Sequence, residues 1–233
     1  MKSYVNKNCL VTGSTGGLGI EIVKEMSRNG ANLFLTGRDE AKLNALQKQL
    51  EGSSFIKKAD FNNLEDINGL IKEVSAKMRI DILINCAGVF PVKSIDESTL
   101  EDYEECFNIN VRAPFLLTKA FSKGMADRKW GRIVNIGSSS AYGGFTNTSL
   151  YCSSKHALLG FSRSAFSELK NSNVRVFCIS PASIKTKMGE SVPNQNFETF
   201  IDPAEVAQCV NFFISFEGNM VSEEVRLNRM SVQ

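Results

Sequence analysis

The chain has 233 residues, of which 42% are hydrophobic, and its formal net charge at pH 7 is +2. A chain of this length and apolar content can bury one substantial core, and single α/β domains of this size are common. The near-neutral charge gives no electrostatic reason to expect nucleic acid or an anionic membrane as a partner. Because the sequence contains neither a signal sequence nor a run of about 18 apolar residues, we expect a soluble cytoplasmic protein.

Six cysteines and a single histidine argue against two further classes of protein. The cysteines form no Cys-x-x-Cys pair and fall in apolar patterns: Cys9, Cys86 and Cys178 in strands, and Cys106, Cys152 and Cys209 in helices. We therefore expect free thiols rather than disulfides, and no metal site, because one histidine completes no zinc-like set. A Ser-His-Asp hydrolase is equally unfavoured, since His156 would have to be its base.

The first elements of the chain form half of a dinucleotide-binding unit. A strand pattern, Val5–Thr12, leads into Gly13-Ser14-Thr15-Gly16-Gly17-Leu18-Gly19, and a helix follows as far as Asn29. Gly13 permits a tight turn, while Gly17 and Gly19 let the backbone approach a pyrophosphate at the helix N-terminus. The alternative is a plain glycine-rich turn between a strand and a helix.

The end of the second strand, Asn32–Thr36, bears on which cofactor is bound. Units that bind NAD usually place an acidic residue here, about 20 residues past the glycines, to meet the ribose hydroxyl. In this chain Gly37 occupies that position and Arg38 follows it. A small residue leaves room for a 2′-phosphate and an arginine suits a phosphate, so the pattern favours NADP(H), with NAD(H) as the alternative. Asp39 either pairs with Arg38 or caps the next helix.

Strands and helices then continue to alternate, as in a parallel sheet covered on both faces. The remaining predicted elements are a helix at Glu40–Leu50, strand Ser54–Ala59, helix Leu64–Met78, strand Ile80–Ile84, a helix from about Leu100 to Met125, a strand ending before Ser138, a helix from Leu150, strand Val174–Ile179 and a last strand at Glu224–Met230. No linker or internal repeat divides the chain, so we expect one α/β domain over residues 1–233.

The helix from Leu150 carries a phenol and an ammonium one turn apart, at Tyr151 and Lys155. Free tyrosine, with a pKa of about 10, is a poor base near neutrality, and a nearby cation favours the phenolate. Ser138, at the tip of the preceding strand, is placed to hydrogen-bond the oxygen that gains or loses the proton. This set predicts acid–base catalysis; the alternative is an amphipathic helix with a surface lysine.

Together the motifs resemble those of the classical short-chain dehydrogenase/reductase family, over roughly residues 5–230. They are Thr-Gly-x-x-x-Gly-x-Gly at 12–19, Asn-x-Ala-Gly at 85–88, Asn110, Ser138, Tyr151-x-x-x-Lys155 and Pro181-x-x-Ile184-x-Thr186. The resemblance implies a Rossmann-like, doubly wound domain with a mostly parallel sheet of about seven strands. It also implies an enzyme that interconverts a carbonyl and a secondary alcohol by hydride transfer with a nicotinamide cofactor.

The resemblance further implies individual roles. Tyr151 would be the general acid in reduction and the base in oxidation, and Lys155 would favour the phenolate and bind the nicotinamide ribose. Ser138 would hold the substrate oxygen, and Asn110 would position a water in a proton relay. The implied cofactor-binding residues are Gly13, Ser14, Thr15, Gly17, Leu18, Gly19, Arg38, Asp60, Phe61, Asn85, Ala87, Gly88, Tyr151, Lys155, Pro181, Ile184 and Thr186. For Asp60 a turn-forming role is the alternative, and for Asn85 a hydrogen bond at the strand end.

The chain departs from the family at its C-terminus. The Asp-Gly-Gly ending that helps to build tetramer contacts is absent from Glu224–Met230, and Ala182 follows Pro181 where glycine is usual. The apolar helix segments Val111–Ala120 and Leu158–Leu169 still match the family's helical dimer face. We therefore expect a homo-oligomer, a homodimer or a homotetramer.

The sequence leaves the substrate open. Residues 187–202 are expected to form a short substrate lid over a small-molecule carbonyl or alcohol. One candidate is a 3-oxoacyl-(acyl-carrier-protein) reductase, because Arg128, Lys129 and Arg132 would suit an acidic carrier protein, although a solvated surface explains them too. A sugar or polyketide-type alcohol dehydrogenase fits equally well. A non-catalytic nucleotide sensor with this fold would be expected to have lost part of the Asn, Ser, Tyr and Lys set, which is complete here.

Overall fold

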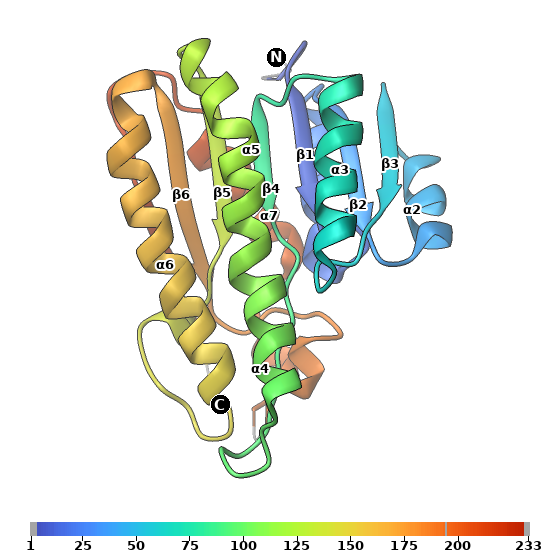
Figure 1. Cartoon of the computed structure of the whole chain (residues 1–233). Helices are drawn as coiled ribbons and strands as arrows, with labels where there is room; N and C mark the ends of the chain where they lie inside the picture. Colours follow the sequence, from blue (N-terminus) through green and yellow to red (C-terminus); the bar gives the residue numbers. More distant parts are fainter. Residues whose placement is uncertain (1–3, 194, 231–233) are drawn as a thin grey trace.

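The computed structural model describes residues 4–193 and 195–230 and contains one seven-stranded parallel sheet in the order β3-β2-β1-β4-β5-β6-β7 (Figure 1). The strands are β1 (Asn8–Thr12), β2 (Asn32–Gly37), β3 (Ser54–Lys58), β4 (Ile82–Asn85), β5 (Gly131–Ile136), β6 (Val174–Pro181) and β7 (Glu224–Leu227). The helices are α1 (Gly17–Arg28), α2 (Glu40–Gln47), α3 (Leu64–Lys77), α4 (Leu100–Phe107), α5 (Ala113–Asp127), α6 (Ser149–Leu169) and α7 (Pro203–Ile214). The α/β Rossmann-like fold predicted from the sequence is confirmed, and every strand pairing is parallel.

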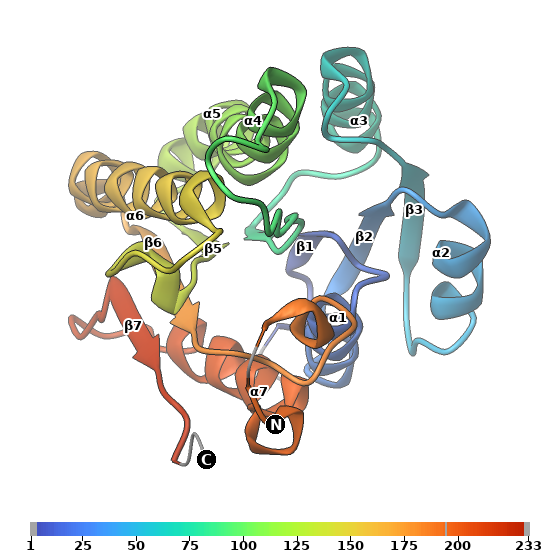
Figure 2. The same cartoon turned by 90° about the horizontal axis from the view of Figure 1, so that it is seen from below.

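The sheet is covered on both faces because successive residues of each strand point to opposite sides. Cys9 and Val11 of β1 join the buried cluster of α1, α2 and α7, whereas Leu10 between them joins that of α3, α5 and α6. Leu33 and Leu35 of β2 are divided from Phe34 in the same way. Figure 2 shows α1 and α7 on one side of the sheet and α3, α5 and α6 on the other.

The strand order reverses between β1 and β4, and this reversal opens a crevice at the carboxyl ends of the strands. Thr12, the last residue of β1, joins the two sides, since its hydroxyl accepts hydrogen bonds from the backbone N–H groups of Cys86 and Ala87, each at 3.0 Å. The turns after β1 and β4 therefore meet at one point. This brings the glycine-rich motif at 12–19 next to the Asn-x-Ala-Gly motif at 85–88.

Several predicted boundaries were wrong. The first strand begins at Asn8 rather than Val5, the last ends at Leu227 rather than Met230, and the helix after Asp39 ends at Gln47. The helix expected from Leu100 to Met125 is α4 and α5 joined by a π-helical turn, Asn108–Arg112. Turns of this kind are rare and often lie at functional sites.

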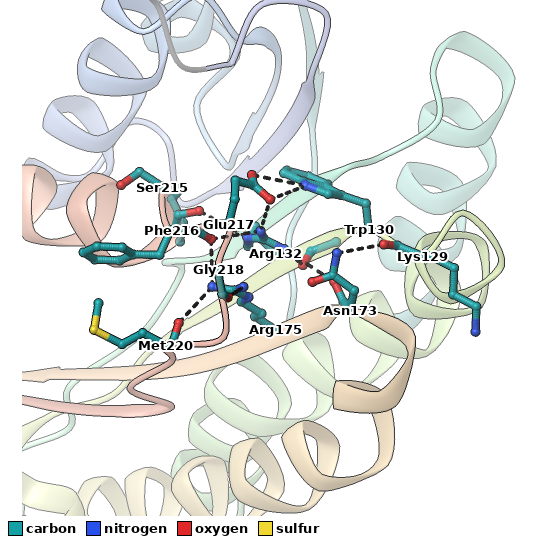
Figure 3. A network of polar contacts seen from close by, with 12 residues as sticks. Lys129, Trp130, Arg132, Asn173, Arg175, Ser215, Phe216, Glu217, Gly218 and Met220 are labelled. Carbon is teal, nitrogen blue, oxygen red and sulfur yellow. Dashed lines mark hydrogen bonds and ion pairs between the residues drawn. The ribbon is translucent and has the colours of Figure 1, made fainter.

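Of the three basic residues considered as a carrier-protein contact, Lys129 is exposed, Arg128 is half-buried and Arg132 is buried. Arg132 is fully buried, and its guanidinium donates hydrogen bonds to the carbonyls of Ile214 and Phe216 and to the Glu217 carboxylate (Figure 3). Arg128 is tied to the Ile80 carbonyl. The prediction for Arg132 was therefore wrong, because its charge satisfies carbonyls at the C-terminal end of α7. Arg132 is also six positions before Ser138 in an extended segment, a separation of roughly 20 Å, so it lies far from this candidate site residue.

Two helical glycines should respond in opposite ways to alanine. A Cβ at Gly19 would overlap the Gly13 carbonyl, whereas a Cβ at Gly160 on α6 meets nothing within 4 Å. Gly160→Ala should stabilise the protein by about 0.5–1 kcal/mol through helix propensity. Gly19→Ala should destabilise it by about 1–3 kcal/mol through overpacking. Urea unfolding without added nucleotide measures both, and equal shifts would contradict the close packing at Gly19.

Candidate active site

A cavity of about 790 Å³ lies along the carboxyl ends of the strands. This volume is typical of sites for small molecules and cofactors. The predicted residues that line it are Gly13, Thr15, Gly17, Leu18, Gly19, Arg38, Asp60, Phe61, Ala87, Gly88, Ser138, Tyr151, Lys155, Pro181, Ile184 and Thr186. Figure 2 looks onto this edge of the sheet. One cavity thus joins the glycine-rich turn to the tyrosine and lysine of α6.

The glycine-rich turn forms a cradle of backbone at the start of α1. Gly13 has a φ of 63°, and a Cβ there would lie 2.8 Å from the Ala87 Cα, so the turn requires glycine for both reasons. The N-cap residue of α1, Gly16, gives the helix no side-chain cap. The first N–H groups of α1 and its positive dipole end therefore lie at the cavity, where they suit an anion.

Beyond this turn, the end of β2 offers positive charge to the cavity. Arg38 is exposed and, in residues 4–193 and 195–230, has no carboxylate partner. Asp39 instead caps α2, accepting a hydrogen bond of 3.0 Å from the Lys42 backbone N–H, and its carboxylate lies 3.4 Å from the Lys42 ammonium. That backbone bond, followed by the Lys42 side chain, holds the pKa of Asp39 below its ordinary value. Of the two roles left open for Asp39, the structure shows the helix cap.

Tyr151 and Lys155 lie on the buried face of α6, at 9% and 5% exposure. The Lys155 ammonium is 5.6 Å from the centre of the Tyr151 ring and donates a hydrogen bond of 2.8 Å to the carbonyl of Ile136, the last residue of β5. The edge of Phe90 packs against Tyr151 with ring centres 4.6 Å apart. A cation, a phenol and a serine hydroxyl, that of Ser138, therefore line one cavity.

Three predicted site residues do not line the cavity. Ser14 is buried, donating to the Val11 carbonyl at 2.7 Å and accepting from the Thr36 N–H at 3.2 Å. Asn85 is buried and donates a hydrogen bond of 2.8 Å to the Asn135 side chain. This is the strand-end hydrogen bond considered as its alternative role. Both stabilise the strands behind the cavity rather than its surface.

Asn110 is the third and is fully buried in the π-helical turn. Its Oδ1 accepts from the Val89 N–H at 2.9 Å, and its Nδ2 donates to the Val89 carbonyl and to Ser154 Oγ, each at 3.0 Å. A Cβ at Gly88 would lie 3.3 Å from Asn110 Oδ1 and 3.9 Å from Lys155 Nζ. The Asn110 amide, behind the cavity wall, and Lys155, which lines the cavity, thus both lie near Gly88.

The segment expected to be the substrate lid closes one side of the cavity. Backbone hydrogen bonds from Lys185 to Ile201 (2.9 Å) and from Ile201 to Ser183 (3.0 Å) join its two ends. Its cavity-lining residues are Lys187, Met188, Gly189, Ser191, Val192, Pro193 and Gln195, while Asn194 lies outside the described residues. Thr186 packs against Gly17, where a Cβ would meet the threonine methyl at 2.7 Å.

Several residues that line the cavity were not predicted from the sequence, among them Lys42, Thr148 and Cys86. Lys42 lines it near Arg38, and a signal was present, because Lys42 falls in the first turn of the helix that Asp39 caps. Thr148, buried at the start of α6, had no signal beyond its place in the loop before Tyr151. Cys86 also lines the cavity, just past the end of β4. Burial raises the pKa of its thiol to about 12, so it is no nucleophile near neutral pH.

All six cysteines are free, as predicted. In the described ranges, no group of three or more His, Cys, Asp or Glu side chains is placed to hold a metal ion. Likewise, none of the helices that the structure describes is long and apolar enough to cross a bilayer.

Comparisons with known proteins agree with this geometry. The family model described as short chain dehydrogenase matches residues 7–196. A 3-oxoacyl-(acyl-carrier-protein) reductase of Aquifex aeolicus is 32% identical over 94% of each chain. A crystal structure of a metagenomic short-chain oxidoreductase in complex with NADP is 27% identical, with a TM-score of 0.85 over 97% of this chain and 98% of the other. A blue fluorescent protein from a metagenomic library in complex with NADPH is 29% identical, with a TM-score of 0.87 over 96% of each chain.

The family match spans most of the chain, and the seven-stranded parallel sheet and its crevice are those of the family's fold. The chain belongs to the short-chain dehydrogenase/reductase family of oxidoreductases, which implies a small-molecule substrate.

Proposed function

We propose that this protein is an NADP(H)-dependent oxidoreductase that interconverts a carbonyl and a secondary alcohol, with Tyr151 as the general acid and base. The supporting observation is that Tyr151, Lys155 and Ser138 line the same cavity as the glycine-rich cradle. A non-catalytic nucleotide sensor would need only the cradle. The buried lysine beside a buried phenol has no evident use in such a protein.

The residues present fit a nicotinamide dinucleotide. The cradle at Gly13–Gly19 suits its pyrophosphate, and Asp60 and Phe61 suit its adenine end. Pro181, Ile184 and Thr186, after β6, would lie against its nicotinamide end. When bound, this cofactor supplies or accepts the hydride.

The roles of the chain's own residues follow from their positions. In reduction the Tyr151 hydroxyl gives its proton to the carbonyl oxygen, and the Ser138 hydroxyl hydrogen-bonds that oxygen. The Lys155 ammonium stabilises the negative charge left on the phenol, because an opposite charge nearby favours the ionised form. The Ile136 carbonyl keeps this ammonium inside the cavity. In oxidation the same groups act in the reverse order.

A preference for NADP(H) over NAD(H) is supported by the end of β2. Gly37 and Arg38 line the cavity where an acidic side chain would select the ribose hydroxyl, and Lys42 adds a second positive charge. Asp39 does not oppose them, because it is engaged in capping α2. Two solved relatives hold NADP or NADPH, and we extend that preference to this chain.

For the substrate, a 3-oxoacyl-(acyl-carrier-protein) is a second, finer candidate, supported by the relative from Aquifex aeolicus. The apolar side chains of Phe90, Phe145, Met188 and Val192 line the cavity and suit an acyl chain. A sugar or polyketide-type alcohol fits less well with these apolar groups. Oxidation of NADPH by an acyl thioester, a cyclic ketone and a sugar ketone separates the candidates. If the protein reduces none of the three, the non-catalytic sensor is favoured.

We also propose that the protein is a homodimer or homotetramer in the cytoplasm. Phe115 of α5 is 45% exposed and packs edge-to-face on Phe161 of α6, with ring centres 5.9 Å apart. This apolar pair lies within the two helix segments expected to form the dimer face, and light scattering would measure the subunit number.

Tyr151→Phe should reduce turnover at least about 100-fold while changing the Kd for NADPH less than twofold. The substitution removes only the hydroxyl that carries the proton, and loss of general acid catalysis costs about 100- to 10,000-fold. Stopped-flow assays give the turnover and fluorescence energy transfer to NADPH gives the Kd. Retained turnover, or loss of NADPH binding, would contradict the proton-donor role.

Arg38→Ala should raise the Kd for NADPH roughly 10- to 100-fold and that for NADH less than twofold. The estimate is the loss of a charge-assisted hydrogen bond of about 1.5–3 kcal/mol, where each 1.4 kcal/mol is tenfold. Lys48→Ala, which removes an exposed charge just past the far end of α2, is the matched control and should change neither Kd. Equal losses for both nucleotides in Arg38→Ala would refute the phosphate contact.

A further inference from the structure

Ser154 is a buried hydroxyl between the two residues proposed to carry the chemistry, and no role above uses it. It is fully buried on α6, immediately before Lys155. Its Oγ donates a hydrogen bond of 2.8 Å to the Tyr151 carbonyl and accepts one of 3.0 Å from Asn110 Nδ2. A hydroxyl has one hydrogen, so the first bond commits it as a donor and leaves it only an acceptor for Asn110.

Ser154 and the Val89 backbone together determine which way the Asn110 amide points. Its NH2 group faces three acceptors, the Val89 carbonyl, Ser154 Oγ and, at 3.5 Å, Cys106 Sγ, and its Oδ1 faces one donor, the Val89 N–H. A half-turn of the amide would place oxygen against the Val89 carbonyl and Ser154 Oγ, and nitrogen against the Val89 N–H. Buried groups left in that state cost free energy, so the observed orientation is favoured. In this orientation, Asn110 Oδ1 lies near Gly88, and the Lys155 ammonium lies near the same glycine.

Asn110 is held by two anchors outside its own element, the Val89 backbone after β4 and Ser154 on α6. It belongs to the π-helical turn Asn108–Arg112, which joins α4 to α5 and has no side-chain cap. Ser154 links the amide of this turn to α6, the helix that carries Tyr151 and Lys155. The hydrogen bond thus fixes the distance between two elements that meet behind the cavity.

We propose that Ser154 is a positioning residue for the reaction: it acts through Asn110 to hold the amide oxygen beside the Lys155 ammonium. The inference deepens the proposed oxidoreductase function and rests on it. Without the Ser154 hydroxyl, the Asn110 amide keeps its hydrogen bonds to the Val89 backbone but loses the one to α6, so it is held less firmly in this orientation.

The kinetic test compares three serines of α6. Ser154→Ala should lower kcat roughly 10-fold, as expected for a lost buried hydrogen bond, and change the Kd for NADPH less than twofold. Ser153→Ala is the exposed control, because Ser153 Oγ makes the same kind of bond, 2.8 Å to the Ser149 carbonyl. Ser162→Ala is the buried control, bonded to the Leu158 carbonyl at 2.7 Å. Neither control should lower kcat, and an equal loss in Ser162→Ala would overturn the inference.

A double-mutant cycle with Asn110→Ala separates positioning from general stability. If Ser154 acts through Asn110, Ser154→Ala lowers kcat in the wild-type background and has no further effect in the Asn110→Ala background. Multiplied losses in the double variant would mean that Ser154 acts independently of Asn110, and would overturn the proposal. The melting temperature of each variant shows whether stability accounts for its kinetics.

A readout that needs no turnover keeps this test separate from the proposed function. In nuclear magnetic resonance spectra, the side-chain N–H signals of Asn110 should exchange slowly with solvent in the wild type and in Ser153→Ala. They should exchange at least 10-fold faster in Ser154→Ala, since a bonded, buried amide becomes partly free. Unchanged exchange would overturn the positioning role even in an active enzyme. Slow exchange in a wild type that reduces no ketone would instead refute the proposed function alone.

Discussion

The hydrogen bond from the Lys155 ammonium to the Ile136 carbonyl is the interaction on which the candidate site depends. A buried ammonium costs several kcal/mol unless it is hydrogen-bonded or paired, and a backbone carbonyl at the end of β5 supplies the partner. Because that carbonyl belongs to the sheet, the charge of α6 is fixed relative to the strands. The cation therefore remains beside the Tyr151 ring and inside the cavity rather than turning to solvent.

The parallel sheet explains why residues far apart in sequence share this cavity. In a parallel sheet all strands end at one edge, so the segments after β1, β2, β4, β5 and β6 converge there. The reversal of strand order between β1 and β4 keeps the crevice open, and Thr12 fixes its two walls together. The same geometry places Arg132, near the start of β5, at the opposite edge, where it stabilises the end of α7.

Much of this arrangement could be predicted because it depends on local signals. Alternating strand and helix patterns gave the sheet and its helices, and most residues predicted for the site follow directly after a strand. What could not be predicted depends on contacts between distant segments. Ser14 and Asn85 stay predicted cofactor-binding residues on the strength of the motif, but their side chains turn into the protein toward partners on neighbouring strands.

The prediction that Arg132 could meet a partner protein was wrong for the same reason. A charged residue suggests a surface position, but the Ile214 carbonyl that Arg132 binds lies more than 80 positions along the chain. The π-helical turn at Asn110 could not be predicted either, since helical periodicity in the sequence continues through it. The motifs that carry the family resemblance therefore located the site, and most of the residues that they indicate line the cavity.

The central claim is that Lys155, held by the Ile136 carbonyl, enables proton transfer by Tyr151. Single-turnover transfer of deuterium from C4-deuterated NADPH to a ketone, at saturating nucleotide, tests it most directly in the wild type and in Lys155→Met. The account predicts an alcohol with one deuterium on its carbinol carbon from the wild type and a rate at least 100-fold lower from Lys155→Met, in line with the loss of acid–base catalysis. Transfer at the wild-type rate in Lys155→Met would contradict it.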